Sequence, residues 1–266
     1  MTFLSEITAI QNIIYIFSSI LFITGIKMLG KEDTAVKGNF FSALAMFIAV
    51  SITLIDVVNP ILLLSGIALG AVIGSFIALK VKMTSIPEMV ALFNGFGGLA
   101  TFLIAWSEFN SIPDNLFQHV LVMTTLYIGG VTFTGSLVAY AKLSEKIKIA
   151  KTSIITKIFT TIFYISLPFL LYSTFVTPFI VTSFEFFTVL LVLTLLGGIG
   201  FVLPIGGGDM PVVISLLNSF SGIAAAFAGL LLLNNVLIVA GSLVGASGLI
   251  LTVIMAKAMN RSISNI

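Results

Sequence analysis

Residues 211–232 read PVVISLLNSFSGIAAAFAGLLL, a run that begins with a proline and holds no charged side chain. A helix needs about 20 such residues to cross the hydrocarbon core of a bilayer, and a proline costs least in the first helical turn. The run therefore predicts a membrane-spanning helix. Its asparagine, Asn218, falls about seven residues from the start, which is roughly 10 Å into the membrane at the helical rise per residue.

The rest of the chain has the same character. Of its 266 residues, 59% are hydrophobic and 8% are charged, whereas a soluble domain is about 45–50% apolar and 25% charged. The absence of cysteine excludes disulfides and thiolate metal sites. We therefore predict a single transmembrane domain over residues 1–266, an all-α, polytopic membrane helix bundle. Its nine spans lie near residues 7–28, 40–58, 60–79, 86–106, 116–141, 153–175, 180–204, 211–232 and 235–257.

The basic residues predict the orientation of this bundle, because loops rich in lysine and arginine stay on the cytoplasmic side. All twelve basic residues fall in or beside the connections that follow the first, third, fifth and ninth predicted spans. The alternate connections carry acidic residues only, among them Glu108 and Asp114. We therefore expect the N-terminus outside and the C-terminus inside.

One motif occurs twice, 124 residues apart: PEMVALFNGFGGLA over residues 87–100 and PVVISLLNSFSGIA over residues 211–224. The two copies share the pattern L-x-N-x-F-x-G-x-A. The second copy lies four predicted spans after the first, an even number of steps, so both helices cross the membrane in the same direction. This pattern indicates a parallel internal repeat.

The repeat places Asn94 and Asn218 at the same depth in two different spans. An amide at that depth needs a partner, so each side chain is expected to point into the bundle. Small or polar residues recur around the asparagines at helical spacing, including Ser215 beside Asn218 and Ser136 on the fifth span. Two interpretations stay open: hydrogen bonds that join helices, and a lining for a narrow file of water.

Three ionisable groups near the helix ends also have two interpretations. Glu88 and Asp209 flank the inner ends of the two repeat helices, where an acid can cap a helix N-terminus or handle protons at the inner mouth. The single histidine, His119, falls near the outer end of the fifth span; it is expected at the membrane interface, since the alternative, a proton relay, would need it deeper. The glycine stripes Gly66, Gly70, Gly74 and Gly241, Gly245, Gly248 favour close helix packing.

The segment GGGDMPVVISLLNSFSGIAAAFAGLLLLNNVLIVAGSLVGASGLILTVIMAKAMNRS, with PEMVALFNGFGGLA and GGVTFTGSLVAYAKL, resembles the membrane part of the beta subunit of proton-translocating NAD(P) transhydrogenase. The resemblance covers essentially the entire chain. It implies an oxidoreductase complex in which hydride transfer between NAD(H) and NADP(H) is coupled to proton passage. Both nucleotides would be bound by partner domains, so we expect no cofactor, hydride-transfer site or metal in this chain.

Carried over by position, the resemblance implies a proton path at Asn218, Ser136 and Gly248, with Asp209 where the NADP(H)-binding domain docks. At Asn94 many family members have a proton-carrying histidine, and an amide cannot titrate. In some members this position is asparagine and a helix of the alpha subunit supplies the histidine, which is the arrangement expected here.

The implied partners are an alpha subunit with the NAD(H) domain and additional helices, an NADP(H)-binding domain, the lipid bilayer and a second copy in a twofold assembly, without nucleic acid. The NADP(H)-binding domain is expected outside this chain, either because the chain is a fragment or because that domain is encoded separately. The implied location is a bacterial inner membrane rather than a mitochondrial one. The alternative function is a stand-alone secondary transporter or channel with parallel repeats.

Overall fold

The computed structural model describes residues 2–56, 60–109, 116–147, 153–175 and 184–262. Within these ranges the regular structure consists of nine α-helices and three short 3₁₀ turns, without a strand. Eight of the helices are long and apolar enough to cross a membrane. The ninth, α7 (Phe184–Val202), has a shorter described apolar stretch, Phe187–Val202. The prediction of an all-α membrane bundle is confirmed.

The first of two compact units comprises residues 1–82 and contains α1 (Thr2–Leu29), α2 (Ala35–Thr53) and α3 (Pro60–Lys80). Helix α1 packs against α2, and the buried Ser18 hydroxyl donates a hydrogen bond to the Ala45 carbonyl at 2.6 Å. Helix α3 buries none of its residues within the part of the chain that the structure describes.

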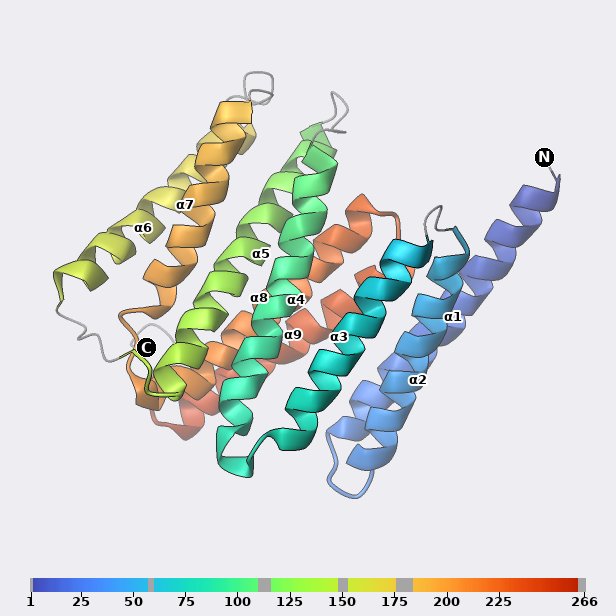
Figure 1. Cartoon of the computed structure of the whole chain (residues 1–266), viewed down its shortest axis with the longest axis horizontal. Coiled ribbons are helices and arrows are strands. Elements are labelled where there is room, and N and C mark those ends of the chain that lie inside the picture. Colours follow the sequence, from blue (N-terminus) through green and yellow to red (C-terminus); the bar gives the residue numbers. More distant parts are fainter. Residues whose placement is uncertain (1, 57–59, 110–115, 148–152, 176–183, 263–266) are drawn as a thin grey trace. The chain divides into compact units, whose positions relative to one another are not determined.

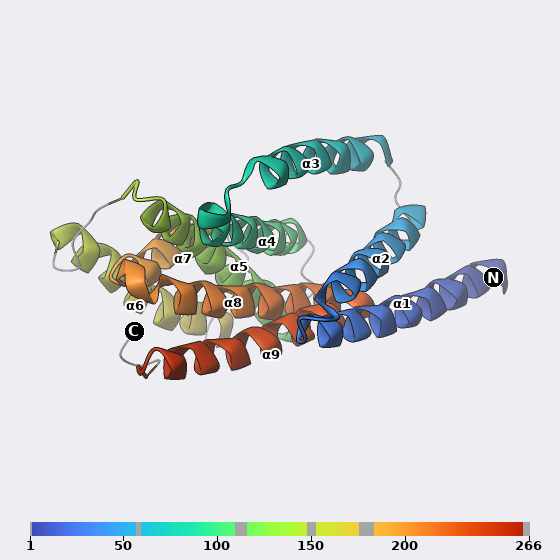
Figure 2. The same cartoon turned by 90° about the horizontal axis from the view of Figure 1, so that it is seen from below.

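The second unit, residues 83–266, contains the remaining helices. They are α4 (Ile86–Phe109), α5 (Leu116–Leu143), α6 (Ile154–Phe175), α7, α8 (Met210–Leu231) and α9 (Asn235–Ala258). Helix α5 packs against α4, α7 and α8, and α6 packs against α7 (Figure 1). Figure 2 shows α8 and α9 running side by side. The most apolar stretch of α5 is 67% buried, against 17% for α6, so α5 is the central helix of this unit.

The two copies of the repeated motif pack alike. In α4, a Cβ added at Gly98 would lie 2.8 Å from the Gly129 carbonyl oxygen of α5. In α8, a Cβ at the equivalent Gly222 would lie 2.8 Å from the Gly241 carbonyl oxygen of α9. Each motif helix therefore makes a close backbone contact with the helix that follows it, at the same place in the motif.

Helix boundaries differ from the predicted spans by a few residues. Helix α2 begins at Ala35 rather than near residue 40, and the last residues of that predicted span form a short 3₁₀ turn over Leu54–Asp56 or lie outside the described ranges. Helix α7 ends at Val202, because Pro204 cannot donate the backbone N–H that a continued helix needs. The first residues of its predicted span, 180–183, lie outside the described ranges.

Alanine substitutions at two adjacent glycines of α4, Gly97 and Gly98, test this close packing. Gly98 faces the α5 backbone, whereas a Cβ at Gly97 would meet nothing within 4 Å. Alanine improves helix propensity by up to about 1 kcal/mol at either position, but overpacking a close contact costs about 1–3 kcal/mol. We expect Gly98→Ala to lower the melting temperature of the detergent-solubilised protein and Gly97→Ala to leave it unchanged or raise it. Equal melting temperatures for both variants would contradict the close contact.

Candidate functional site

A hydrogen-bonded cluster joins three helices of the second unit around Asn94 of α4. The Asn94 amide Nδ2 donates to Ser136 Oγ of α5 at 2.9 Å. The Ser221 Oγ of α8 donates to Asn94 Oδ1 at 2.8 Å. Because a polar side chain in a bilayer must find its partners inside the protein, this Asn94 cluster (Asn94, Ser136 and Ser221) fixes how the three helices meet.

Small residues beside Asn94 allow the cluster to form. A Cβ at Gly95 would lie 3.2 Å from the Ser136 Cβ, and Gly98 contacts α5 one turn further along. Helix α5 can therefore approach α4 closely enough for a serine, whose hydroxyl is one bond from Cβ, to reach the amide. The predicted site residues Asn94 and Ser136 are thus brought together.

A second group of predicted site residues lies between α8 and α9. The buried Ser215 hydroxyl donates to the Gly248 carbonyl oxygen at 3.2 Å, and the Thr252 hydroxyl donates to the same oxygen at 2.8 Å. The Ser219 hydroxyl donates to the Gly245 carbonyl at 2.6 Å. Hydroxyl-to-backbone bonds of this kind hold two helices together where glycines let their backbones approach.

Asn218 is half-buried in α8, and its side chain makes no hydrogen bond with the residues that the structure describes. It precedes Ser221 by three residues, so the two side chains lie on the same side of α8. The two repeat asparagines are therefore not bonded to each other. Asn94 reaches α8 through Ser221, which the repeat does not single out because its counterpart in the first copy is Gly97.

The two predicted acids, Asp209 and Glu88, share no hydrogen bond within the described ranges. Asp209 occupies the N-cap position of α8, as one interpretation predicted, but its side chain makes no capping hydrogen bond there. Its Oδ2 instead accepts a hydrogen bond from Arg261 Nη1 at 3.0 Å, in an ion pair whose arginine is half-exposed. Glu88 lies half-buried in the first turn of α4, without an ion-pair partner in the described ranges.

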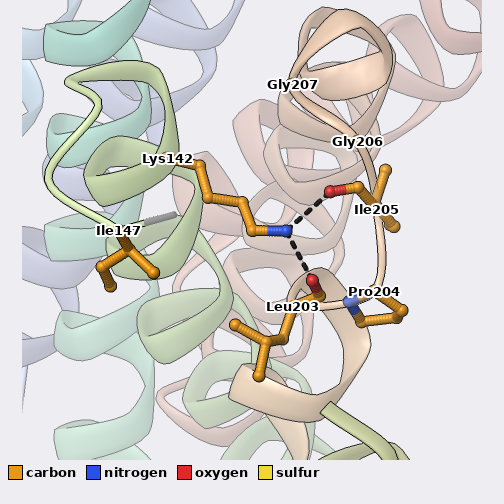
Figure 3. Close-up of a pocket in the computed structure, with 7 residues that line it drawn as sticks. All are labelled: Lys142, Ile147, Leu203, Pro204, Ile205, Gly206 and Gly207. Carbon is orange, nitrogen blue, oxygen red and sulfur yellow. Dashed lines mark hydrogen bonds between the residues drawn. The ribbon is translucent and has the colours of Figure 1, made fainter. Parts of the chain in front are cut away.

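Lys142 holds the C-terminal end of α7, a role that the sequence did not reveal. Its Nζ donates to the carbonyl oxygens of Leu203 and, at 2.7 Å, of Ile205 (Figure 3). A cation is favourable there because the last carbonyls of a helix carry partial negative charge and lack helical partners. The ammonium group borders a cavity of about 210 Å³ whose lining includes Ile147, Pro204, Gly206 and Gly207.

His119 lies near the beginning of α5, as predicted, and it is packed inside the protein. It lies in the first turn of the helix, with 6% of its surface exposed. The described residues contain no group of three or more acidic or histidine side chains that could hold a metal ion. The polar chemistry of this unit therefore consists mainly of amides and hydroxyls in the helix interior, with cations and acids at the helix ends.

Substitution of Lys142 tests its role at the end of α7. In Lys142→Met the carbonyls of Leu203 and Ile205 lose a charged donor, and such bonds contribute about 1.5–3 kcal/mol each. We expect a lower melting temperature and faster proteolysis within the loop 206–208. The control is Lys146→Met, since Lys146 is exposed and, among the described residues, its Nζ donates only to the Tyr140 hydroxyl, at 3.0 Å. If both variants behave alike, Lys142 does not stabilise this helix end.

Comparison with known proteins identifies relatives of nearly the whole chain. The sequence model of the family described as NAD(P) transhydrogenase beta subunit matches residues 11–266. The NAD(P) transhydrogenase subunit beta of Rhodospirillum rubrum is 38% identical over 263 residues, covering 95% of this chain, and the sequence from a named strain of that species matches equally. The chain spans 56% of the length of these relatives. It belongs to the NAD(P) transhydrogenase beta-subunit family.

Proposed function

We propose that this chain is the proton-conducting membrane part of a proton-translocating NAD(P)⁺ transhydrogenase. It couples hydride transfer between NAD(H) and NADP(H) to proton movement across a bacterial inner membrane. Family membership and the spanning helices support this proposal. The observation that carries it is the Asn94 cluster, a set of paired polar side chains at the junction of three helices that are otherwise largely apolar.

Hydride transfer is assigned to partner domains. The NAD(H) domain belongs to an alpha subunit, and an NADP(H)-binding domain completes the complex in a twofold assembly. The membrane part then contributes the driving force, because a charge that crosses the membrane gains about 2.3 kcal/mol per 100 mV of potential. That energy reaches the nucleotides only if proton movement changes the contacts between the membrane helices and the docked domains.

The Asn94 cluster orients water rather than carrying the proton itself. An amide has no titratable group near neutral pH, and the Asn94 amide oxygen and one of its N–H groups are already bonded to serines. The titrating group is a histidine from an alpha-subunit helix, as the family pattern implies. Asn218 supports this arrangement, since its half-buried amide has no hydrogen-bond partner among the described residues and can bond water or an incoming side chain.

The inner ends of the helices provide the docking place for the NADP(H)-binding domain. Three exposed glycines, Gly206 to Gly208, connect the carbonyls held by Lys142 to the Asp209–Arg261 ion pair. A glycine loop that is fixed at both ends by cations can act as a hinge, which lets a docked domain move relative to the helices. Asp209 and Glu88 are the inner-mouth acids of this region.

The function is tested in inside-out vesicles that contain this chain with its alpha and NADP(H)-domain partners. NADPH-driven reduction of an NAD analogue is followed together with an internal pH dye. Acidification that needs both nucleotides and collapses with a protonophore is the expected result. If the confirmed complex shows no nucleotide-linked acidification, the proposal is wrong and a stand-alone transporter becomes the better account.

Replacing the Asn218 amide should abolish proton pumping without affecting assembly of the complex. Asn218→Leu keeps the side-chain size but leaves water without a hydrogen-bonding group at this position, so we expect normal assembly and loss of nucleotide-driven acidification. The matched control is Asn39→Leu, the same change at an exposed position of α2. Unchanged pumping by Asn218→Leu would remove Asn218 from the proton path, and loss of pumping in both variants would indicate a nonspecific effect.

A further inference from the structure

Two threonines of α5 break the usual rule for hydroxyls in helices. The hydroxyls of Thr101, Thr134, Thr174 and Thr252 donate to a carbonyl three or four residues earlier. Thr125 and Thr132 are fully buried, and their hydroxyls have no hydrogen-bond partner in the described ranges. A buried polar group without a partner costs free energy, so each such case in a folded protein needs an explanation.

Both threonines lie on the face of α5 that packs against α4. Gln118, Thr125, Thr132 and Ser136 fall within an arc of about 40° at 100° per residue. Ser136 bonds Asn94 of α4, and a Cβ at Gly98 of α4 would lie 3.0 Å from the Thr132 Cβ. By contrast, Thr134 lies on the far side of α5, next to Gly198 of α7.

A third hydroxyl, that of Thr101 on α4, lies at a level of α5 between the two threonines. A Cβ at Gly129 would lie 2.8 Å from Thr101 Oγ1 of α4, and Gly129 stands between Thr125 and Thr132 along α5. Although the Thr101 hydroxyl donates to Gly98, its oxygen can still accept. At the outer end, the buried Oε1 of Gln118 also lacks a partner among the described residues. Polar atoms thus recur from the Asn94 cluster to the beginning of α5.

We propose that Thr125 and Thr132 are water-binding positions in the seam between α4 and α5, and that this seam is the outer half of the proton path. The proposal rests on the proposed function and extends it to residues outside the repeated motif. In the structure Gly98 and Gly129 bring the two backbones together, so the seam is closed and the two threonine hydroxyls have no hydrogen-bond partner in the described ranges. Water that enters between the helices would form hydrogen bonds with these hydroxyls. The hydroxyls therefore favour a hydrated seam over a closed one.

Cysteine labelling tests the water directly, because the chain contains no cysteine of its own. Thr125→Cys and Thr132→Cys are made in the full complex, reconstituted in liposomes, and treated with aminoethyl methanethiosulfonate. Modification of this chain is followed by mass spectrometry. The reagent reacts with thiolate, which needs water, so both cysteines should react about tenfold faster or more than Thr134→Cys, the control on the other face. Rates equal to that control would overturn the proposal.

Threonine-to-valine variants test whether this water carries protons. Valine keeps the shape and removes the hydroxyl, so Thr125→Val and Thr132→Val should assemble normally and lose most nucleotide-driven acidification. Thr134→Val is the control and should keep it. Unchanged pumping in the first two variants would remove the seam from the path even if its cysteines react. The labelling experiment measures water in the seam and does not require proton pumping. If the unsubstituted complex fails to acidify vesicles, the proposed function is wrong, but the labelling rates still test whether the seam holds water.

Discussion

An amide inside a lipid bilayer has no bulk water to satisfy it, so Asn94 must find its hydrogen bonds within the protein. It does so by bonding a serine from each of two other helices, Ser136 of α5 and Ser221 of α8. Lipid tails are as apolar as leucine, so apolar side chains alone do not favour one helix rotation over another. The Asn94 amide favours one rotation, because turning any one of the three helices breaks its hydrogen bond to Ser136 or to Ser221. The arrangement of the second unit around α5 depends on this constraint.

Close packing and polar pairing support each other in this unit. Gly98 lets α5 approach α4, and Gly222 lets α9 approach α8, at the same place in the two motif copies. Short hydroxyl side chains can then reach partners on a neighbouring helix, as Ser136 reaches Asn94 and Ser219 reaches Gly245. A helix junction built in this way keeps its polar atoms in the interior, where a proton path needs them, without a wide pore.

Much of this could be predicted from the sequence, since the length and apolarity of a span are local properties. The nine helices, the repeat and the pairing of Asn94 with polar neighbours follow from patterns along one chain. The identity of each hydrogen-bond partner could not be predicted, because it depends on helix rotation and on contacts between residues far apart in the sequence. Ser221 has a glycine as its repeat counterpart, Lys142 looks like a topology-setting charge, and Arg261 lies 52 residues from Asp209. Conversely, Asp209 has the right position for a cap but a stronger partner in Arg261.

In the proposed mechanism the two serines, Ser136 and Ser221, act on proton movement through the one amide that they share, Asn94. The most direct test is a double-mutant cycle on nucleotide-driven acidification, with Ser136→Ala, Ser221→Ala and the double variant in the same complex. If both serines serve only to orient Asn94, the double variant should pump no worse than the weaker single variant, because effects within one unit are not additive. Losses that multiply, as for independent sites, would contradict the account.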